Sequence, residues 1–208
     1  MELVLGGFGW DQEGVVYAFS GPLDRGDLSA GAASDSWQGE GTGHQLGEAL
    51  TTGDLDGDGV DEIVASSSYW PGDLQRRGRV YLLRPAIAAA DSTFVVDGDV
   101  GPQTFGTASA TGDFDGDGQD DLAVGNPAHL DEAERGRVLV FFGPLEGHHQ
   151  AAEADLSLAG EAAGDDAGFA LASGDVTGDG FADLVVGAPR NDEGAEDGGK
   201  IYLLPGPL

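Results

Sequence analysis

The feature that most constrains the fold of this chain is an internal repeat of about 60 residues. An acidic, glycine-rich segment occurs three times without gaps, at residues 53–64, 112–125 and 174–187. A second segment, in which a glycine is followed by apolar or β-branched residues, occurs four times and starts at Gly14, Gly78, Gly136 and Gly199. A repeat of this kind indicates a chain of similar supersecondary units that bury their apolar faces against one another.

Each unit contains four short apolar or β-branched segments separated by turn residues. In the clearest unit we expect strands around residues 46–52, 62–66, 79–83 and 93–97. Four short strands per repeat are typical of a β-propeller blade. Aligned on this unit, the chain supplies three strands, two complete blades and three further strands. We therefore predict an all-β fold of about 3.5 four-stranded blades in one propeller segment, with units at residues 1–40 (partial), 41–98, 99–160 and 161–208 (partial).

Composition excludes several classes of protein. The 208 residues include 38 Asp and Glu against 9 Lys and Arg, a formal net charge of −29, which argues against a nucleic-acid partner. The sequence has no apolar run long enough to span a membrane, so membrane insertion is not expected. The first residues do not have the pattern of a secretory signal peptide. The chain has no Cys, so neither disulfides nor thiolate chemistry are expected.

Particular motifs carry a family resemblance. Phe105-Gly106, the acidic loops and Gly187-Ala188-Pro189 resemble the FG-GAP repeat, the blade of the integrin α-subunit propeller and of many bacterial surface proteins. The resemblance implies an extracellular or cell-surface binding or scaffold module that is not an enzyme. The chain departs from the motif at Leu46-Gly47, Ala167-Gly168, Ser66-Ser67-Ser68 and Gly125-Asn126-Pro127.

The acidic loops follow the pattern DxDxDGxxD or a close variant. Alternate residues of a tight loop point toward a common centre, and the glycine at position six allows the sharp turn. Oxygen ligands without His or Cys favour Ca²⁺, and we predict three structural Ca²⁺ sites per chain. The predicted side-chain ligands are Asp54, Asp56, Asp58 and Glu62 in the first loop, Asp113, Asp115, Asp117 and Asp121 in the second, and Asp175, Thr177, Asp179 and Asp183 in the third.

The resemblance adds one backbone ligand to each loop, the position-seven carbonyl of Val60, Gln119 or Phe181. Because Thr177 replaces an acid, the third loop is expected to bind Ca²⁺ most weakly. An EF-hand also opens with DxDxDG, but it requires a bidentate Glu at position 12, where this chain has Ala65, Val124 or Val186. Solvated turns are the other alternative, since Asp and Gly favour turns; three copies in one ligand register favour metal.

Three aromatic residues are candidates for partner binding. Trp10, Tyr69 and Trp70 fall between the second and third strands of their blades, on the face that the resemblance places opposite the calcium loops. Exposed aromatics are common anchors for protein partners and can stack on a sugar. The alternative is local packing of a long loop. Arg25-Gly26-Asp27 is interpreted as an ordinary turn, and His148-His149 as part of a polar, solvated connector.

The open arc of blades bears on assembly. Unclosed blades expose strand edges and apolar faces, so we expect a homo-oligomer, such as a dimer, or the remainder of a larger propeller. The alternative function is a propeller lectin or a carbohydrate-active enzyme that uses the face opposite the calcium loops. The sequence contains no nucleophile elbow, phosphate-binding loop or HExxH motif.

Overall fold

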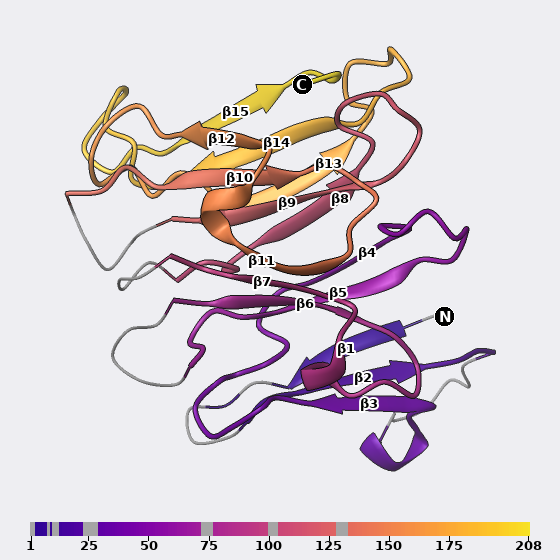
Figure 1. Ribbon diagram of the computed structural model, residues 1–208. Helices are drawn as coiled ribbons and strands as arrows, with labels where there is room; N and C mark the ends of the chain where they lie inside the picture. Colours follow the sequence, from indigo (N-terminus) through magenta and orange to yellow (C-terminus); the bar gives the residue numbers. More distant parts are fainter. Residues whose placement is uncertain are drawn as a thin grey trace.

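The computed structural model describes residues 3–7, 9, 13–22, 29–71, 77–99, 104–127 and 133–208. In these residues the chain forms four small sheets that follow one another like the blades of a propeller (Figure 1). The first sheet contains β1 (Leu3–Gly7), β2 (Val15–Phe19) and β3 (Asp35–Gln38); the second contains β4 (Leu50–Gly53), β5 (Glu62–Ser67), β6 (Arg79–Leu83), β7 (Phe94–Asp97) and the added strand β11 (Gly147–Gln150). The third contains β8 (Ser109–Gly112), β9 (Asp121–Asn126), β10 (Arg137–Phe141) and β12 (Leu156–Ala159); the fourth contains β13 (Ala170–Gly174), β14 (Asp183–Ala188) and β15 (Lys200–Leu204).

The prediction of an all-β partial propeller is confirmed. Within each sheet, consecutive propeller strands are antiparallel neighbours. In the described residues, the single-turn 3₁₀ helices η1 (Ala30–Ala32), η2 (Ala89–Asp91) and η3 (Ala151–Glu153) directly precede the strands β3, β7 and β12. Of the helices that the structure describes, none is long and apolar enough to cross a membrane.

The expected innermost strand of the second blade is shorter than predicted. It begins at Leu50 rather than at Leu46, because Leu46 forms a parallel bridge with Gly14 of the first blade instead. The Leu46 N–H donates to the Glu13 carbonyl over 3.2 Å. The residue that carries the Phe-Gly-like motif therefore joins two blades rather than extending a strand.

The strand β11 was not predicted. It leaves the third blade between β10 and β12 and pairs in parallel with β7, with Gly147 opposite Phe94 and Gln150 opposite Asp97. The interpretation of His148-His149 as a connector was therefore wrong, whereas the expected exposure to solvent holds for His148, whose side chain is 55% exposed. His148 Nε2 lies 2.9 Å from Asp97 Oδ2, and the His149 ring lies 5.5 Å from the Phe94 ring. The strand β11 covers the outer edge of the second blade, which would otherwise present unpaired backbone groups.

The recurrent glycines allow the blades to approach closely. At Gly78, where φ is +79°, an added Cβ would lie 1.9 Å from the Phe105 carbonyl oxygen of the next blade. The N–H of Gly106 in turn donates to the Gly125 carbonyl over 2.9 Å. Glycine is needed at such positions because other residues avoid positive φ and carry a side chain.

The core lies between blades rather than inside one sheet. Between the second and third blades, Val80 and Leu82 are buried with Leu122, Leu139 and Phe141 in one cluster. Similar clusters lie between the first and second blades and between the third and fourth. Because blades bury apolar side chains only where another blade covers them, the outer faces of the first and fourth blades are the exposed ends of the arc.

The innermost strands position the acidic loops. The strands β4, β8 and β13 lie side by side, and the Thr111 hydroxyl donates to the Thr52 carbonyl over 2.6 Å. The Ser173 hydroxyl donates to the Thr111 carbonyl over the same distance. These bonds align the three strands, so the loops that follow them project from the same side of the molecule, at the right of Figure 1.

Candidate metal centre

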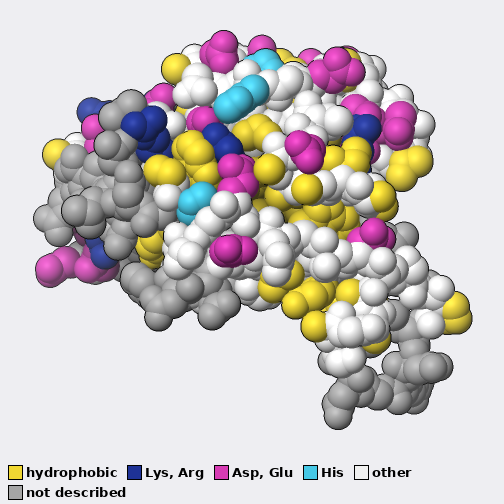
Figure 2. Space-filling model, turned by 60° about the horizontal axis from the view of Figure 1, so that its bottom comes forward, with side chains coloured by type: hydrophobic (Ala, Val, Ile, Leu, Met, Phe, Trp, Pro, Cys, Tyr) yellow, Lys and Arg dark blue, Asp and Glu magenta, His cyan; other side chains and the backbone are white. Residues whose placement is uncertain are grey.

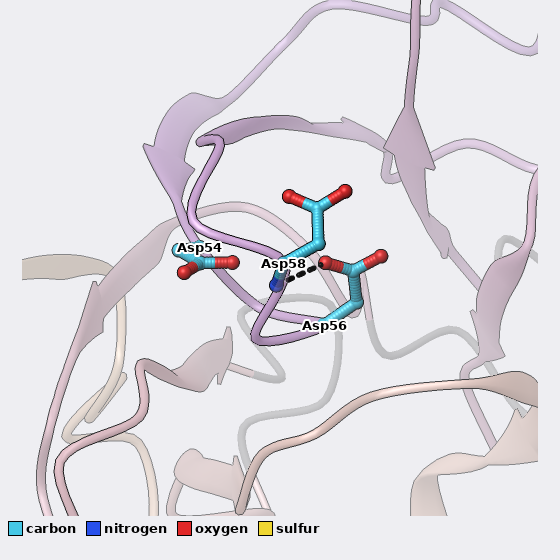
Figure 3. A group of neighbouring side chains, drawn as sticks. All are labelled: Asp54, Asp56 and Asp58. Carbon is cyan, nitrogen blue, oxygen red and sulfur yellow. Dashed lines mark hydrogen bonds between the residues drawn. The ribbon is translucent and has the colours of Figure 1, made fainter.

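The first acidic loop joins β4 to β5 and gathers three carboxylates. Asp54, Asp56 and Asp58 each offer one oxygen, and these oxygens all lie within 4.8 Å of one another (Figure 3). The N–H of Gly59 donates to Asp54 Oδ2 over 2.9 Å, and the N–H of Asp58 donates to Asp56 Oδ1 over 3.1 Å. The other Asp54 oxygen, Oδ1, is buried and has no hydrogen-bond partner among the residues that the structure describes. A buried, unpartnered carboxylate oxygen beside two further carboxylates is an environment that a cation would stabilise.

The second loop joins β8 to β9 and repeats the arrangement. Asp113, Asp115 and Asp121 form a group with oxygens within 4.8 Å of one another. Asp121 is fully buried and accepts hydrogen bonds from the N–H groups of Phe114 at 2.7 Å and Gly143 at 2.9 Å. Burial raises the pKa of Asp121 to about 6 in spite of these hydrogen bonds. A neighbouring cation would oppose this rise, since opposite charge favours the ionised carboxylate.

The third loop joins β13 to β14 and has the same backbone turn with fewer acids. Asp175 accepts hydrogen bonds from the N–H groups of Gly178 at 2.6 Å and Gly180 at 3.1 Å. Thr177 replaces the second acid, and its N–H donates to Asp183 Oδ2 over 2.7 Å. Burial acts to raise the pKa of Asp183, but hydrogen bonds from the backbone N–H groups outweigh it, and the pKa lies below its ordinary value. The third loop therefore offers three acidic ligands, whereas the second offers four.

The residues at positions five and seven of the loops lie near solvent. Asp117, Asp179 and the hydrophobic side chains of Val60 and Phe181 are exposed. The Gln119 amide donates to Asp117 Oδ2 over 3.3 Å. Ligation by the carbonyls of Val60, Gln119 and Phe181 stays a prediction.

The closing acid of the first loop has a partner that the sequence interpretation missed. Glu62 is buried, and burial is the largest of the causes that raise its pKa. Arg84 Nη2 lies 3.3 Å from Glu62 Oε1 and also forms an ion pair with Asp56. The sequence did carry a signal for this partner. Arg84 directly follows the third strand of its blade, a position that is occupied by uncharged Phe142 and Pro205 in the next two blades.

The donor set fits a hard divalent cation. In the described loops every predicted side-chain ligand is a carboxylate except Thr177, whose ligand is a hydroxyl; neither His nor Cys takes part. Such oxygen sets select Ca²⁺ over softer metals. When bound, the ion would link the start and the end of each loop and neutralise the repulsion among its carboxylates. The residues that could hold it are those predicted from the sequence.

The candidate partner-binding aromatics are half-buried where the structure describes them. Tyr69 and Trp70 follow β5, at the end of the blade opposite the acidic loop. The Trp70 ring packs against the Arg79 guanidinium, and its Nε1 atom is buried with no hydrogen-bond partner in the described ranges. Trp10 and residues 25–27 lie outside the described residues. Partner binding by Trp10, Tyr69 and Trp70 stays a prediction.

Four sheets in blade order, with acidic loops at one end of the inner strands, define a segment of a β-propeller with candidate cation sites. The FG-GAP repeat family model matches residues 46–83, 105–141 and 167–204. Each match spans one acidic loop and the strands beside it, and together they cover more than half of the chain. The chain belongs to the FG-GAP repeat family, and the resemblance noted in the sequence is confirmed.

Proteins with different names and roles are similar in sequence to most of this chain. The chain is 34% identical over 180 residues to integrin alpha-PS2 of Drosophila melanogaster, covering 77% of this chain and 12% of that protein. It is 32% identical over 170 residues to the human phosphatidylinositol-glycan-specific phospholipase D, covering 76% and 20%. It is also 32% identical over 207 residues to human integrin alpha-IIb, covering 86% and 20%. The chain thus spans at most a fifth of the length of these relatives.

Proposed function

We propose that this chain is a calcium-stabilised propeller module whose three acidic loops each hold one structural Ca²⁺. The observation that carries the proposal is the repeated loop geometry. In all three loops the first Asp accepts a hydrogen bond from the glycine at position six, at 2.9 Å for Gly59, 3.0 Å for Gly118 and 3.1 Å for Gly180. The buried, unpartnered Asp54 Oδ1 and the raised pKa of Asp121 support a cation beside them.

Calorimetric titration of the metal-free chain with Ca²⁺ tests this proposal. We expect three binding events, with dissociation constants of about 10⁻⁴ to 10⁻³ M, the range of extracellular calcium modules. Asp113→Asn should remove one event, because it replaces a carboxylate ligand of the second loop. Asp155→Asn is the matched control, since Asp155 is an exposed acid outside the loops. Absence of any calcium-dependent heat in the unaltered chain would contradict the proposal.

We further propose that the module binds or organises partners outside the cell and does not itself catalyse a reaction. Similarity to integrin alpha chains supports a binding role. Similarity to a phospholipase D is confined to the FG-GAP region, so it supports a shared module rather than a shared reaction. The clustered carboxylates also belong to the candidate metal loops. Acidic side chains are spread over the face shown in Figure 2, which suits an environment rich in divalent cations.

We also propose that the two ends of the arc mediate self-association. In the fourth blade Ile201 is 75% exposed and Leu203 is 44% exposed. Their equivalents in strand register, Val138 and Val140, are fully buried against the fourth blade itself. The outer face of the fourth blade therefore has the side chains of a blade interface without a covering blade.

The first blade offers a complementary face. Leu5, which pairs with Tyr17, is 42% exposed. The corresponding pair in the second blade, Ala65 and Tyr81, is fully buried against the first blade. One copy can thus place its first blade on the fourth blade of another, as consecutive blades do within the chain. Because each copy carries a net charge of −29, association should strengthen with salt and Ca²⁺.

Light scattering in Ca²⁺ and moderate salt tests self-association. We expect a mass of at least twice 21.2 kDa for the unaltered chain. The double variant Ile201→Glu, Leu203→Glu should be monomeric, because it buries two charges in the contact. The double variant Ala90→Glu, Ala152→Glu carries the same added charge at exposed sites away from both end faces and should keep the assembly. A folded monomer in the unaltered chain at all salt concentrations would overturn this proposal.

A further inference from the structure

The closing carboxylates of the three loops are not held in the same way. In the second loop, Asp121 Oδ1 accepts a hydrogen bond from the Gly143 N–H over 2.9 Å. In the third loop, Asp183 Oδ1 accepts the equivalent bond from Gly206 over 3.1 Å. The corresponding residue of the second blade is Pro85, which has no N–H to donate. Glu62 still accepts a hydrogen bond from the Leu55 N–H to Oε2 over 3.2 Å, but the bond that the glycine supplies in the other two loops is replaced by a different contact.

Arg84 supplies that contact. Its Nη2 atom lies 3.3 Å from Glu62 Oε1 and forms a second ion pair with Asp56. The side chains of Arg84 and Glu62 are only 25% and 3% exposed, so water screens this charge poorly. Trp37 anchors the backbone at this point, because its Nε1–H donates to the Arg84 carbonyl over 3.0 Å. The charge of Arg84 thus reaches into the same loop that gathers Asp54, Asp56 and Asp58.

The contacts of this guanidinium within the loop are ionic rather than directional. Its Nε and Nη2 atoms are buried and make no aligned hydrogen bond within the described part of the chain, so the contacts with Asp56 and Glu62 are ion pairs rather than a directional fork. A pocket of about 330 Å³ is lined by Asp56 and Arg84 and also by Glu146. This pocket offers a displaced guanidinium both space and a second carboxylate.

We propose that Arg84 is an internal counter-cation of the first loop, which Ca²⁺ must displace from Asp56 and Glu62. This inference rests on the proposed calcium function. The first and second loops have the same number of acidic ligands, yet the first should fill at a higher Ca²⁺ concentration, because one unit of positive charge already occupies it. The number of acidic ligands differs only in the third loop. It therefore does not predict a difference in Ca²⁺ affinity between the first and second loops. Arg84 also keeps the first loop ordered when Ca²⁺ is absent.

The amides of Gly59, Gly118 and Gly180 allow each loop to be followed separately. Each donates to the first Asp of its own loop, so its ¹H–¹⁵N resonance should shift when that loop binds Ca²⁺. In the unaltered chain, the Gly118 resonance should reach its midpoint at lower Ca²⁺ than the Gly59 resonance. In Arg84→Gln, the Gly59 midpoint should move to lower Ca²⁺ by about tenfold, as expected for loss of one nearby, partly screened charge. The Gly118 and Gly180 midpoints should not move.

Two variants serve as controls. Arg84→Lys keeps the positive charge and should retain most of the weak affinity of the first loop. Arg137→Gln removes a positive charge that pairs with Asp99, outside the loops, and should leave all three midpoints unchanged. A Gly59 midpoint that Arg84→Gln does not move, while all three glycines respond to Ca²⁺, would overturn the role of Arg84 and leave the calcium function standing. Glycine resonances that do not respond to Ca²⁺ in any variant would overturn the calcium function.

The metal-free chain gives an independent readout of the counter-cation. With a chelator present, Arg84→Gln should lower the melting temperature by about 2–4 °C, the shift expected for 1 kcal/mol in a domain of this size. Arg84→Lys should restore most of it, and added Ca²⁺ should remove the difference between Arg84→Gln and the unaltered chain. Equal melting temperatures of Arg84→Gln and the unaltered chain in chelator would contradict the counter-cation role, whatever the outcome with Ca²⁺.

Discussion

The guanidinium carbon of Arg79 lies 3.5 Å from the centroid of the Trp70 ring. The same guanidinium donates to Asp97 Oδ2 and to Glu40 Oε1, each over 2.9 Å, and so connects the first blade to the second. The hydroxyl of Tyr81 also donates to Glu40 Oε1 over 2.9 Å. Trp70 therefore covers a largely buried ionic network. Any loss of partner affinity in a Trp70 variant has to be compared with its loss of stability.

Removing the charge of Arg79 should destabilise the fold. Arg79→Gln removes the guanidinium from Asp97 and Glu40, which keep only His148 and the Tyr81 hydroxyl, and should lower the free energy of unfolding by about 3 kcal/mol, the cost of breaking a buried ion pair. Urea unfolding in the presence of Ca²⁺ measures it. Lys200→Gln is the matched control, because the partners of Lys200, Glu161 and Glu193, are 52% and 67% exposed. This change should cost much less, because exposed ion pairs contribute little to stability, and equal costs would argue against the network.

The contact between blades at Gly78 should not tolerate a side chain. Gly78→Ala places a Cβ against the Phe105 carbonyl at a positive φ, and the combined strain and overpacking should cost about 3 kcal/mol. Gly31→Ala is the control, since nothing lies within 4 Å of a Cβ at that position. Thermal unfolding of the two variants should separate them clearly. An unchanged melting temperature for Gly78→Ala would mean that the blades are less closely packed than described.

Chelation of Ca²⁺ should lower stability. At a free Ca²⁺ concentration 10 to 100 times the dissociation constant, each occupied site adds about 1.4 to 2.7 kcal/mol to the free energy of unfolding. Unfolding curves with Ca²⁺, with Mg²⁺ and with chelator should therefore show the highest stability in Ca²⁺. Mg²⁺ should have a smaller effect, because it requires a more regular geometry and gives up water reluctantly. Identical curves in all three solutions would count against a structural metal.

Neutralising Asp121 should lower the stability of the metal-free chain and should also remove one Ca²⁺ site. In Asp121→Asn, the side-chain NH₂ group can face the N–H of Phe114 or Gly143, which now donate to the carboxylate. One unsatisfied buried donor should cost about 1–3 kcal/mol in the metal-free chain, and one Ca²⁺ site should also be lost. Asp155→Asn is the control, since exposed Asp155 accepts a single backbone N–H from Phe142 over 2.9 Å. Equal behaviour of the two variants in calorimetry would exclude Asp121 as a ligand.

The sequence alone determined the architecture of this protein. The strand pattern and the glycine positions recur at each repeat because every blade has the same local requirements. Each blade needs short strands, tight turns and a backbone that can approach its neighbour closely. The strand bounds at 79–83 agree with β6 to the residue. The three acidic loops could be located for the same reason, since their ligands lie within nine consecutive positions of one turn and depend little on distant residues.

Contacts between distant residues were decided only by the tertiary structure. The strand β11 joins β7 across about 50 residues of sequence, and its polar residues His148 and His149 carry no strand pattern. The distinct environment of the first loop depends on Arg84, which lies beyond the next strand and reaches Glu62 only after β5 and β6 pair. The stacking of Trp70 on Arg79 likewise brings a residue that follows β5 against a residue of β6. Local sequence patterns specify turns and strands, whereas burial and charge pairing between blades arise only when the blades pack.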